Sequence, residues 1–246
     1  MQLASNTVLI TGGASGIGLA LARRFIQDGS TVIVCGRREE KLAEARKNHP
    51  ELKTLACDLS KEKDRVRLSE WATKEFPRLN VLVNNAGIQR RVRIGGDKKW
   101  SATHEEIAIN FEAPVHLTAL FLPHLMKQER PAIMNVTSGL AFSPMASAPI
   151  YCATKAALHS FTLSLRHQLA GTRVQVIEII PPAVNTDLGG PGLHTFGVAV
   201  DEFVNAVTMG LRQGEPEIAY GYSQRASQAS RSELDEIFQR MNQAAS

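Results

Sequence analysis

The sequence predicts an α/β fold, a single domain over residues 1–246 with a doubly wound sheet of about seven mostly parallel strands and helices on both faces. Short apolar runs alternate with longer segments of helical period along the chain. The runs VLI, VIV and VQVIEII are almost continuously apolar, as strands buried on both faces of a parallel sheet require. Regular alternation of strand and helix is typical of right-handed βαβ units.

Each strand is expected where a β-rich apolar run falls between turn residues. The expected strands are 7–11, 31–35, 52–56, 81–84, 132–137, 174–180 and 217–220. Segments with helical period lie between them, at 16–28, 39–48, 61–75, 103–127, 149–170 and 201–212. Thr103 and Glu106 have capping-box spacing and would begin the helix over 103–127. Glycines and prolines gather at 185–200, a stretch that we expect to form a lid over a substrate, and 231–241 is expected to form a short amphipathic helix.

Composition and charge exclude several classes of protein. The chain has 246 residues, 43% of them hydrophobic, and a net charge of +4, which excludes a disordered chain. No apolar run reaches the roughly 18 residues that span a bilayer, so no membrane partner is expected. Basic residues alternate with acidic ones, as in RREEK at 37–41, which disfavours nucleic acid as a partner. The three cysteines form no CxxC pair, which predicts no zinc site, no other metal and a reduced, cytoplasmic location.

A glycine-rich turn, TGGASGIG at 11–18, directly follows the first expected strand and opens the first helix. Glycines at such a turn let the backbone approach a pyrophosphate, which would lie at the helix N-terminus, where free N–H groups favour an anion. The same string could simply form a tight strand-to-helix turn, but the strand, turn and helix occur in the order that a dinucleotide site needs.

Two arginines follow the second expected strand, where an NAD-selective site usually has a carboxylate for the ribose hydroxyls. Arg37 and Arg38 could instead bind a 2′-phosphate through paired N–H groups. The alternative is that they are ordinary surface arginines at the start of an exposed helix. We therefore expect NADP(H) in preference to NAD(H), with Arg37 as the main phosphate ligand.

A second constellation combines Ser138 with Tyr151 and Lys155. The tyrosine and lysine are four residues apart and would share one face of a helix. A nearby ammonium lowers the pKa of a phenol, which could then exchange a proton with a carbonyl or alcohol oxygen. Ser138 ends the fifth expected strand, the edge where open α/β sheets bind ligands. Taken alone, Tyr151 and Lys155 would more readily be interpreted as an exposed helical pair.

Together these motifs resemble the short-chain dehydrogenases/reductases over residues 6–220. TGGASGIG, NNAG at 84–87, YCATK at 151–155 and PPAVNT at 181–186 occur in that family's order. The resemblance implies a Rossmann-type fold and an NADP(H)-dependent oxidoreductase that interconverts a carbonyl and an alcohol by hydride transfer. Within the family the chain also resembles little-characterised bacterial oxidoreductases of the lipoteichoic-acid D-alanylation operon, a likeness that names no substrate.

The resemblance also implies roles for single residues. Tyr151 would be the general acid/base and Lys155 would lower its pKa while holding the nicotinamide ribose. Ser138 would orient the substrate oxygen, and Asn110 would support a water in a proton relay. The expected cofactor-binding residues include Tyr151 and Lys155, together with Gly12, Ser15, Gly16, Ile17, Gly18, Arg37, Arg38, Asp58, Leu59, Asn84, Ala86, Gly87, Val184 and Thr186.

The chain departs from the family pattern in two places. Pro182 stands where the family usually has glycine, which removes a backbone donor and changes the floor of the nicotinamide site. The glycine-rich C-terminal ending of tetrameric members is missing, so a homo-oligomer, favouring a dimer, is expected.

The substrate is expected to be a small or medium apolar carbonyl or alcohol. The residues expected around it are mostly apolar: Gln89, Leu140, Phe142, Pro182, Leu188 and Phe196. Arg90, Arg91 and Arg93 could attract an acidic substrate or belong to a solvated loop. Two further functions stay open: a catalytically idle NADP(H)-binding regulator and a sugar-nucleotide epimerase, which would normally need a larger substrate lobe.

Overall fold

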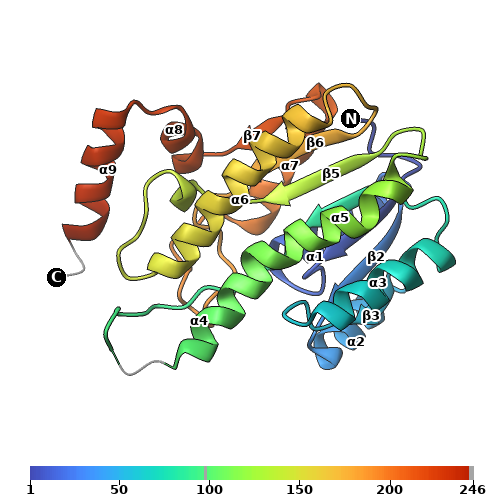
Figure 1. The fold of residues 1–246 in the computed structure, drawn as a ribbon, viewed down its shortest axis with the longest axis horizontal. Coiled ribbons are helices and arrows are strands. Elements are labelled where there is room, and N and C mark those ends of the chain that lie inside the picture. Colours follow the sequence, from blue (N-terminus) through green and yellow to red (C-terminus); the bar gives the residue numbers. More distant parts are fainter. Residues whose placement is uncertain (97–98, 244–246) are drawn as a thin grey trace.

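The fold is that of a doubly wound α/β protein, in a computed structural model that describes residues 1–96 and 99–243. Its described strands form one parallel sheet of seven strands in the order β3-β2-β1-β4-β5-β6-β7 (Figure 1). The predicted fold class is therefore confirmed, and each strand lies within two residues of its predicted bounds. The strands are β1 (Thr7–Thr11), β2 (Thr31–Gly36), β3 (Lys53–Ala56), β4 (Val81–Asn84), β5 (Ala132–Val136), β6 (Gln175–Ile180) and β7 (Glu217–Ala219).

Helices cover both faces of this sheet. One apolar cluster joins β1 and β2 to α1, α2 and α7, and a second joins the opposite face to α3, α5 and α6. The helices on these faces are α1 (Gly16–Gln27), α2 (Glu39–Asn48), α3 (Glu62–Glu75), α5 (Ala113–Leu125), α6 (Pro149–Gln168) and α7 (Val200–Gln213). Strand order reverses between β1 and β4, so the loops leaving their carboxyl ends diverge and open a crevice there.

The long helix expected over 103–127 is interrupted, and its expected start is wrong. Helix α4 (Trp100–Ile107) begins before Thr103, and Glu106 is buried and accepts a hydrogen bond from the backbone N–H of Arg90 at 3.1 Å. No capping box forms, because the chain is already helical before Thr103. A π-helical turn, Ala108–Glu112, then precedes α5. Pro114 has no N–H to donate to the carbonyl of Asn110, which accounts for the break in the α-helical pattern.

The C-terminal part of the chain contains one helix that the sequence did not predict. Helix α8 (Tyr222–Gln228) comes before α9 (Arg231–Gln243), the helix expected over 231–241. Residues 185–200 are irregular as expected, apart from the last residue, which begins α7, and the parallel bridge between Val184 and Val198 at their border. Their role as a lid remains a prediction. None of the described helices is long and apolar enough to cross a membrane.

Candidate active site

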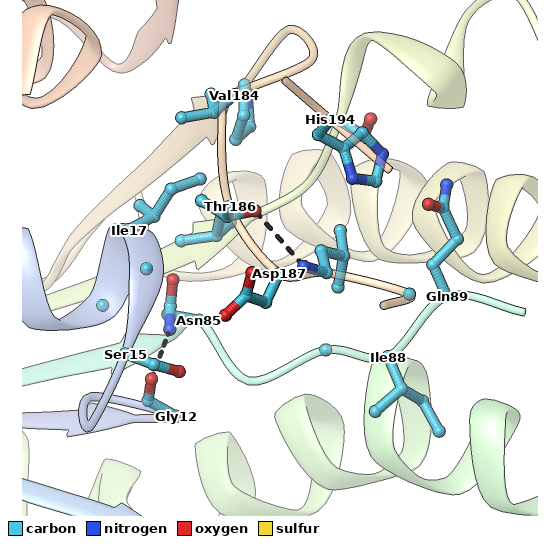
Figure 2. A pocket seen from close by; sticks show the side chains of 18 of the residues that line it. Gly12, Ser15, Ile17, Asn85, Ile88, Gln89, Val184, Thr186, Asp187 and His194 are labelled. Atoms are coloured by element: carbon cyan, nitrogen blue, oxygen red, sulfur yellow. Dashed lines mark hydrogen bonds between the residues drawn. The ribbon is translucent and has the colours of Figure 1, made fainter. Parts of the chain in front are cut away.

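A cleft of about 1230 Å³ opens at the carboxyl edge of the sheet, where the crevice between β1 and β4 leads to the loop after β6. Figure 2 shows Gly12, Ser15 and Asn85 at one end and Gln89 and His194 at the other. Sixteen of the residues predicted from the sequence for catalysis or cofactor binding line this cleft: Gly12, Ser15, Gly16, Ile17, Gly18, Arg37, Arg38, Asp58, Leu59, Ala86, Gly87, Ser138, Tyr151, Lys155, Val184 and Thr186.

The glycine turn has a shape that requires glycine. Gly12 and Gly16 have φ of +64° and +53°, a region that side chains with a Cβ rarely adopt. A Cβ on Gly18 would lie 2.4 Å from the Asn85 amide nitrogen and 2.6 Å from the carbonyl oxygen of Gly12. Ser15, extended at the N-cap of α1, makes no side-chain capping bond, so the first N–H groups of the helix remain free for an anion. These residues fit the pyrophosphate of a dinucleotide.

Asn85 is a supporting residue that the sequence reasoning missed, although it stands within the NNAG motif. Its side-chain amide donates to the carbonyl of Thr11 at 2.8 Å, while its backbone N–H donates to the Thr11 hydroxyl at 3.0 Å. These bonds tie the loop after β4 to the turn after β1. The preceding Asn84 does not line the cleft: its amide donates to Asn135 at 2.8 Å within the buried sheet. Its predicted contact with the cofactor is therefore corrected to a supporting place between β4 and β5.

The two arginines after β2 have different partners. Arg37 forms an ion pair with Glu105 of α4, and Glu105 also binds Arg90. Arg38 instead donates to the Ser15 hydroxyl at 3.2 Å, beside the glycine turn. Both arginines line the cleft, but the positive charge of Arg37 is already balanced by a carboxylate. This pairing could not be read from the sequence, because the partners are 68 residues apart.

Tyr151 and Ser138 meet at the inner wall of the cleft. Both side chains are buried, at 6% and 7% exposure, which rules out the exposed-pair interpretation of the tyrosine. Burial raises the pKa of the Tyr151 phenol well above its usual value, and hydrogen bonding with the Ser138 hydroxyl lowers it only in part. Ser138 also accepts a hydrogen bond from the backbone N–H of Leu140 at 3.1 Å, which fixes its hydroxyl oxygen.

Lys155 lies one helical turn beyond Tyr151 on α6 and is 3% exposed. Its ammonium donates to the carbonyl of Val136 at 2.7 Å and lies 5.7 Å from the centre of the Tyr151 ring. Burial lowers the pKa of Lys155 to about 8, because a low-dielectric environment disfavours the charged form. The ammonium therefore lies close to the tyrosine and loses its proton at a lower pH than an exposed lysine does.

Asn110 does not line the cleft directly but lies close behind it, on the π-helical turn. Its amide exchanges hydrogen bonds with the backbone of Ile88, accepting from the N–H at 2.9 Å and donating to the carbonyl at 2.8 Å. A Cβ built on Gly87 would touch both the Asn110 oxygen, at 3.5 Å, and the Lys155 nitrogen, at 3.6 Å. Asn110 thus fixes the loop between the glycine turn and Lys155.

The opposite wall comes from the loop after β6. Val184, Thr186 and Asp187 face the glycine turn in Figure 2, and the Thr186 hydroxyl accepts a hydrogen bond from the N–H of Leu188 at 3.4 Å. Five of the six residues predicted around the substrate line the cleft: Gln89, Leu140, Pro182, Leu188 and Phe196. Phe142 does not. Its ring packs on His159 at 4.6 Å between centroids and is therefore corrected to a packing residue outside the cleft.

Several cleft residues carried no recognisable signal in the sequence. Met145, His194, Tyr222 and Met241 also line it, and the last two come from α8 and α9. His194 has a buried Nδ1 with no hydrogen-bond partner within the described residues. Only the folded chain brings the C-terminal helices to this wall.

The remaining polar features belong to other surroundings. Arg90 is held by Glu105 and by the carbonyl of Ala102, so it is not a free attractor for acidic substrates. The cysteines Cys35, Cys57 and Cys152 are buried free thiols. No group of three or more His, Cys, Asp or Glu side chains in residues 1–96 and 99–243 is arranged to hold a metal ion.

Comparison with known proteins agrees with this geometry. Residues 6–193 match the short chain dehydrogenase family. The chain is 50% identical to the uncharacterized oxidoreductase DltE of Bacillus subtilis, over 98% of both chains. A short chain dehydrogenase from Burkholderia cenocepacia, solved in complex with NADP, superposes with a TM-score of 0.84 at 27% identity and covers 97% of this chain and 99% of its own.

A second solved structure, a short chain dehydrogenase/reductase from Burkholderia phymatum in complex with NAD, has the same TM-score of 0.84 at 21% identity, with 96% of each chain covered. That likeness concerns the fold alone. The family match spans the glycine turn and the Ser138, Tyr151 and Lys155 constellation, and the chain belongs to the short-chain dehydrogenases/reductases, a family of oxidoreductases.

Proposed function

We propose that the protein reduces a ketone or aldehyde to an alcohol, or catalyses the reverse oxidation, with NADP(H) as the hydride carrier. The observation that carries the proposal is that Ser138, Tyr151 and Lys155 line one cleft together with a glycine turn shaped for a pyrophosphate. A regulator that only binds a dinucleotide has no need for a buried proton donor beside that turn. When bound, the nicotinamide supplies or accepts the hydride.

The chain's own residues would donate and accept the proton that accompanies the hydride. In the reducing direction Tyr151 donates its phenolic proton to the carbonyl oxygen, and the Ser138 hydroxyl holds the same oxygen by a hydrogen bond. The phenolate that forms lies near the Lys155 ammonium, whose positive charge stabilises it. Because burial raises the pKa of Tyr151, the tyrosine is stored in the protonated form that reduction requires. Asn110 keeps the Ile88 loop in place beside Lys155.

NADP(H) is proposed over NAD(H) because the end of β2 presents arginines and no carboxylate. Arg38, at hydrogen-bond distance from Ser15, would bind the 2′-phosphate first, with Arg37 as a second cation whose charge Glu105 balances. The Burkholderia cenocepacia relative solved with NADP supports this preference.

The substrate would be a mostly apolar carbonyl compound. Leu140, Met145 and Leu188 pack against the apolar cluster that contains Tyr151, and Gln89 and His194 add polar groups at the far end of the cleft. A cytoplasmic location and a dimeric assembly remain predictions.

The decisive experiment is a screen of aliphatic and aromatic ketones and aldehydes, followed by NADPH consumption, with the Tyr151→Phe variant as control. We expect turnover by the native protein and none by the variant, while both still bind NADPH. If NADPH binds and no carbonyl is reduced across the screen, the binding-regulator function takes precedence. If neither nicotinamide binds, the enzymatic proposal fails altogether.

A further inference from the structure

A buried carboxylate lies behind the cleft, where the proposed reaction makes no use of it. Glu178 stands in the middle of β6 and is 0% exposed, although every neighbour on that strand from Val176 to Ile180 is apolar. A carboxylate in such surroundings is costly unless hydrogen bonds and charge partners satisfy it. Its partners therefore indicate what holds it there.

Two residues from other elements bind Glu178. The hydroxyl of Thr137, just beyond β5, donates to Oε1 at 2.7 Å. The Nδ1 atom of His159, on α6, lies 3.0 Å from Oε1 and 2.9 Å from Oε2. Hydrogen bonding with Glu178 raises the pKa of His159, and burial opposes this shift only in part, so the carboxylate favours the charged form of the imidazole.

Thr137 and His159 both lie close in the chain to residues of the proposed catalytic set. Thr137 immediately precedes Ser138, and its own N–H donates to the carbonyl of Ile179 at 2.9 Å. His159 lies one helical turn beyond Lys155 and two beyond Tyr151 on α6. Its ring also packs on Phe142, in the loop that follows Ser138, at 4.6 Å between centroids. The Thr137–Glu178–His159 cluster thus joins the segment that carries Ser138 to the helix that carries Tyr151.

We propose that Glu178 and His159 are positioning residues that, through Thr137, hold the Ser138 hydroxyl against the phenol of Tyr151. The inference rests on the proposed function, since it assigns the cluster a part in the same reaction. The backbone N–H of Thr137 bonds to β6, and that of Gly139 bonds to the carbonyl of Pro181, just after β6, at 3.0 Å; these two bonds fix the main chain on either side of Ser138. The bond from the Thr137 hydroxyl to Glu178 also fixes the side chain of Thr137, which restrains rotation of the segment that leads into Ser138.

The test compares Thr137→Val with Thr137→Ser. Valine keeps the shape and removes the hydroxyl, while serine keeps the hydroxyl. We expect Thr137→Val to lower kcat about tenfold or more, since a displacement of about 1 Å can cost about 10²-fold. The Kd for NADPH should stay unchanged, and Thr137→Ser should restore most of the rate. Glu178→Gln should lower kcat as well, whereas Glu70→Gln, at an exposed position on α3, should not.

A second measurement works without any substrate. The chain has three tyrosines, so a ¹³C-ring-labelled sample gives few signals, and Tyr151→Phe assigns the one that matters. Ser138→Ala removes the partner of Tyr151, and we expect Thr137→Val and Glu178→Gln to shift the Tyr151 signal in the same direction. The signals of Tyr220 and Tyr222 report whether each variant is folded.

The outcomes separate the two proposals. An unmoved Tyr151 signal in both folded variants overturns the positioning role, whatever the activity. A moved signal together with an inactive native protein supports the positioning role and counts against the proposed reaction. Should Glu178→Gln fail to fold, the valine and serine pair at position 137 decides alone.

Discussion

The buried ammonium of Lys155 makes a strong prediction about stability. Its pKa falls from 10.5 to about 8 because of burial, and each pKa unit corresponds to about 1.36 kcal/mol. Burying the charged form therefore costs on the order of 3 kcal/mol at neutral pH. Lys155→Met replaces the ammonium with an apolar chain of similar length and loses the bond to Val136, worth about 1 kcal/mol. We expect the variant to be about 2 kcal/mol more stable than the native protein at pH 7.

The sign of the pH dependence follows from proton binding. Below pH 8 both the folded and the unfolded chain carry the Lys155 proton, so the cost of burial is present in full. Between pH 8 and 10.5 the unfolded chain binds more protons than the folded one, so the free energy of unfolding rises with pH. The advantage of Lys155→Met should accordingly shrink between pH 7 and pH 9.5.

Urea unfolding of both proteins at the two pH values, without dinucleotide, measures this difference. Bound ligand would stabilise the folded state and hide it. Lys63→Met, at an exposed position on α3, is the matched control and should change little at either pH. A Lys155→Met variant that is less stable than the native protein at pH 7, or an advantage equally large at pH 9.5, would refute the reasoning. The variant should also lose the catalytic activity, so stability and function oppose each other at this residue.

Three further predictions concern the cleft. Arg38→Ala should weaken NADPH binding at least about tenfold and leave NADH binding almost unchanged in a fluorescence titration; an equal loss for both would remove Arg38 from the phosphate site. Gly18→Ala should abolish dinucleotide binding and lower stability by about 1–3 kcal/mol, because its Cβ meets neighbours at 2.4 and 2.6 Å; Gly171→Ala, with nothing within 4 Å, should do neither. Asn110→Ala leaves the N–H and carbonyl of Ile88 without their bonds at 2.9 and 2.8 Å. The free energy of unfolding should fall by about 1–3 kcal/mol per group, measured as a lower midpoint of thermal unfolding. An unchanged midpoint would mean that water replaces the amide.

Much of the fold could be predicted because the sheet is parallel and buried on both faces. Such strands need apolar side chains at nearly every position, so runs like VLI and VIV mark them plainly and their bounds come out within two residues. The π-helical interruption of the long helix at Ala108–Glu112 was harder to predict. Helical period continues through it, and only Pro114 signals that the ladder of hydrogen bonds must change there. Helix α8 lies in a polar stretch, YSQRASQ, whose few apolar residues give no periodic pattern.

The site divides in the same way between local and long-range information. The glycine turn and the spacing of Tyr151 and Lys155 involve residues close together in the chain, so both can be recognised in the sequence. The partner of Arg37 is not local: Glu105 lies on α4, and only the folding of α4 beside the end of β2 brings it there. Asn84 and Phe142 were placed wrongly for a related reason, since the side of a strand or loop to which a residue points depends on its neighbours in space.

The proton states of Tyr151 and Lys155 depend on burial more than on their spacing. Four residues of separation put the phenol and the ammonium on one face of α6, from which a lowered pKa of the tyrosine would follow if both were exposed. In the folded chain both side chains are buried, at 6% and 3% exposure, in the wall of the cleft that Ser138, Leu140 and Met145 also line. Burial then raises the pKa of the phenol and lowers that of the ammonium to about 8, so two values that lie close together in exposed side chains move apart. In the proposed reduction the phenol therefore starts in its protonated form, and it is burial of the side chain, more than the four-residue spacing, that sets this state.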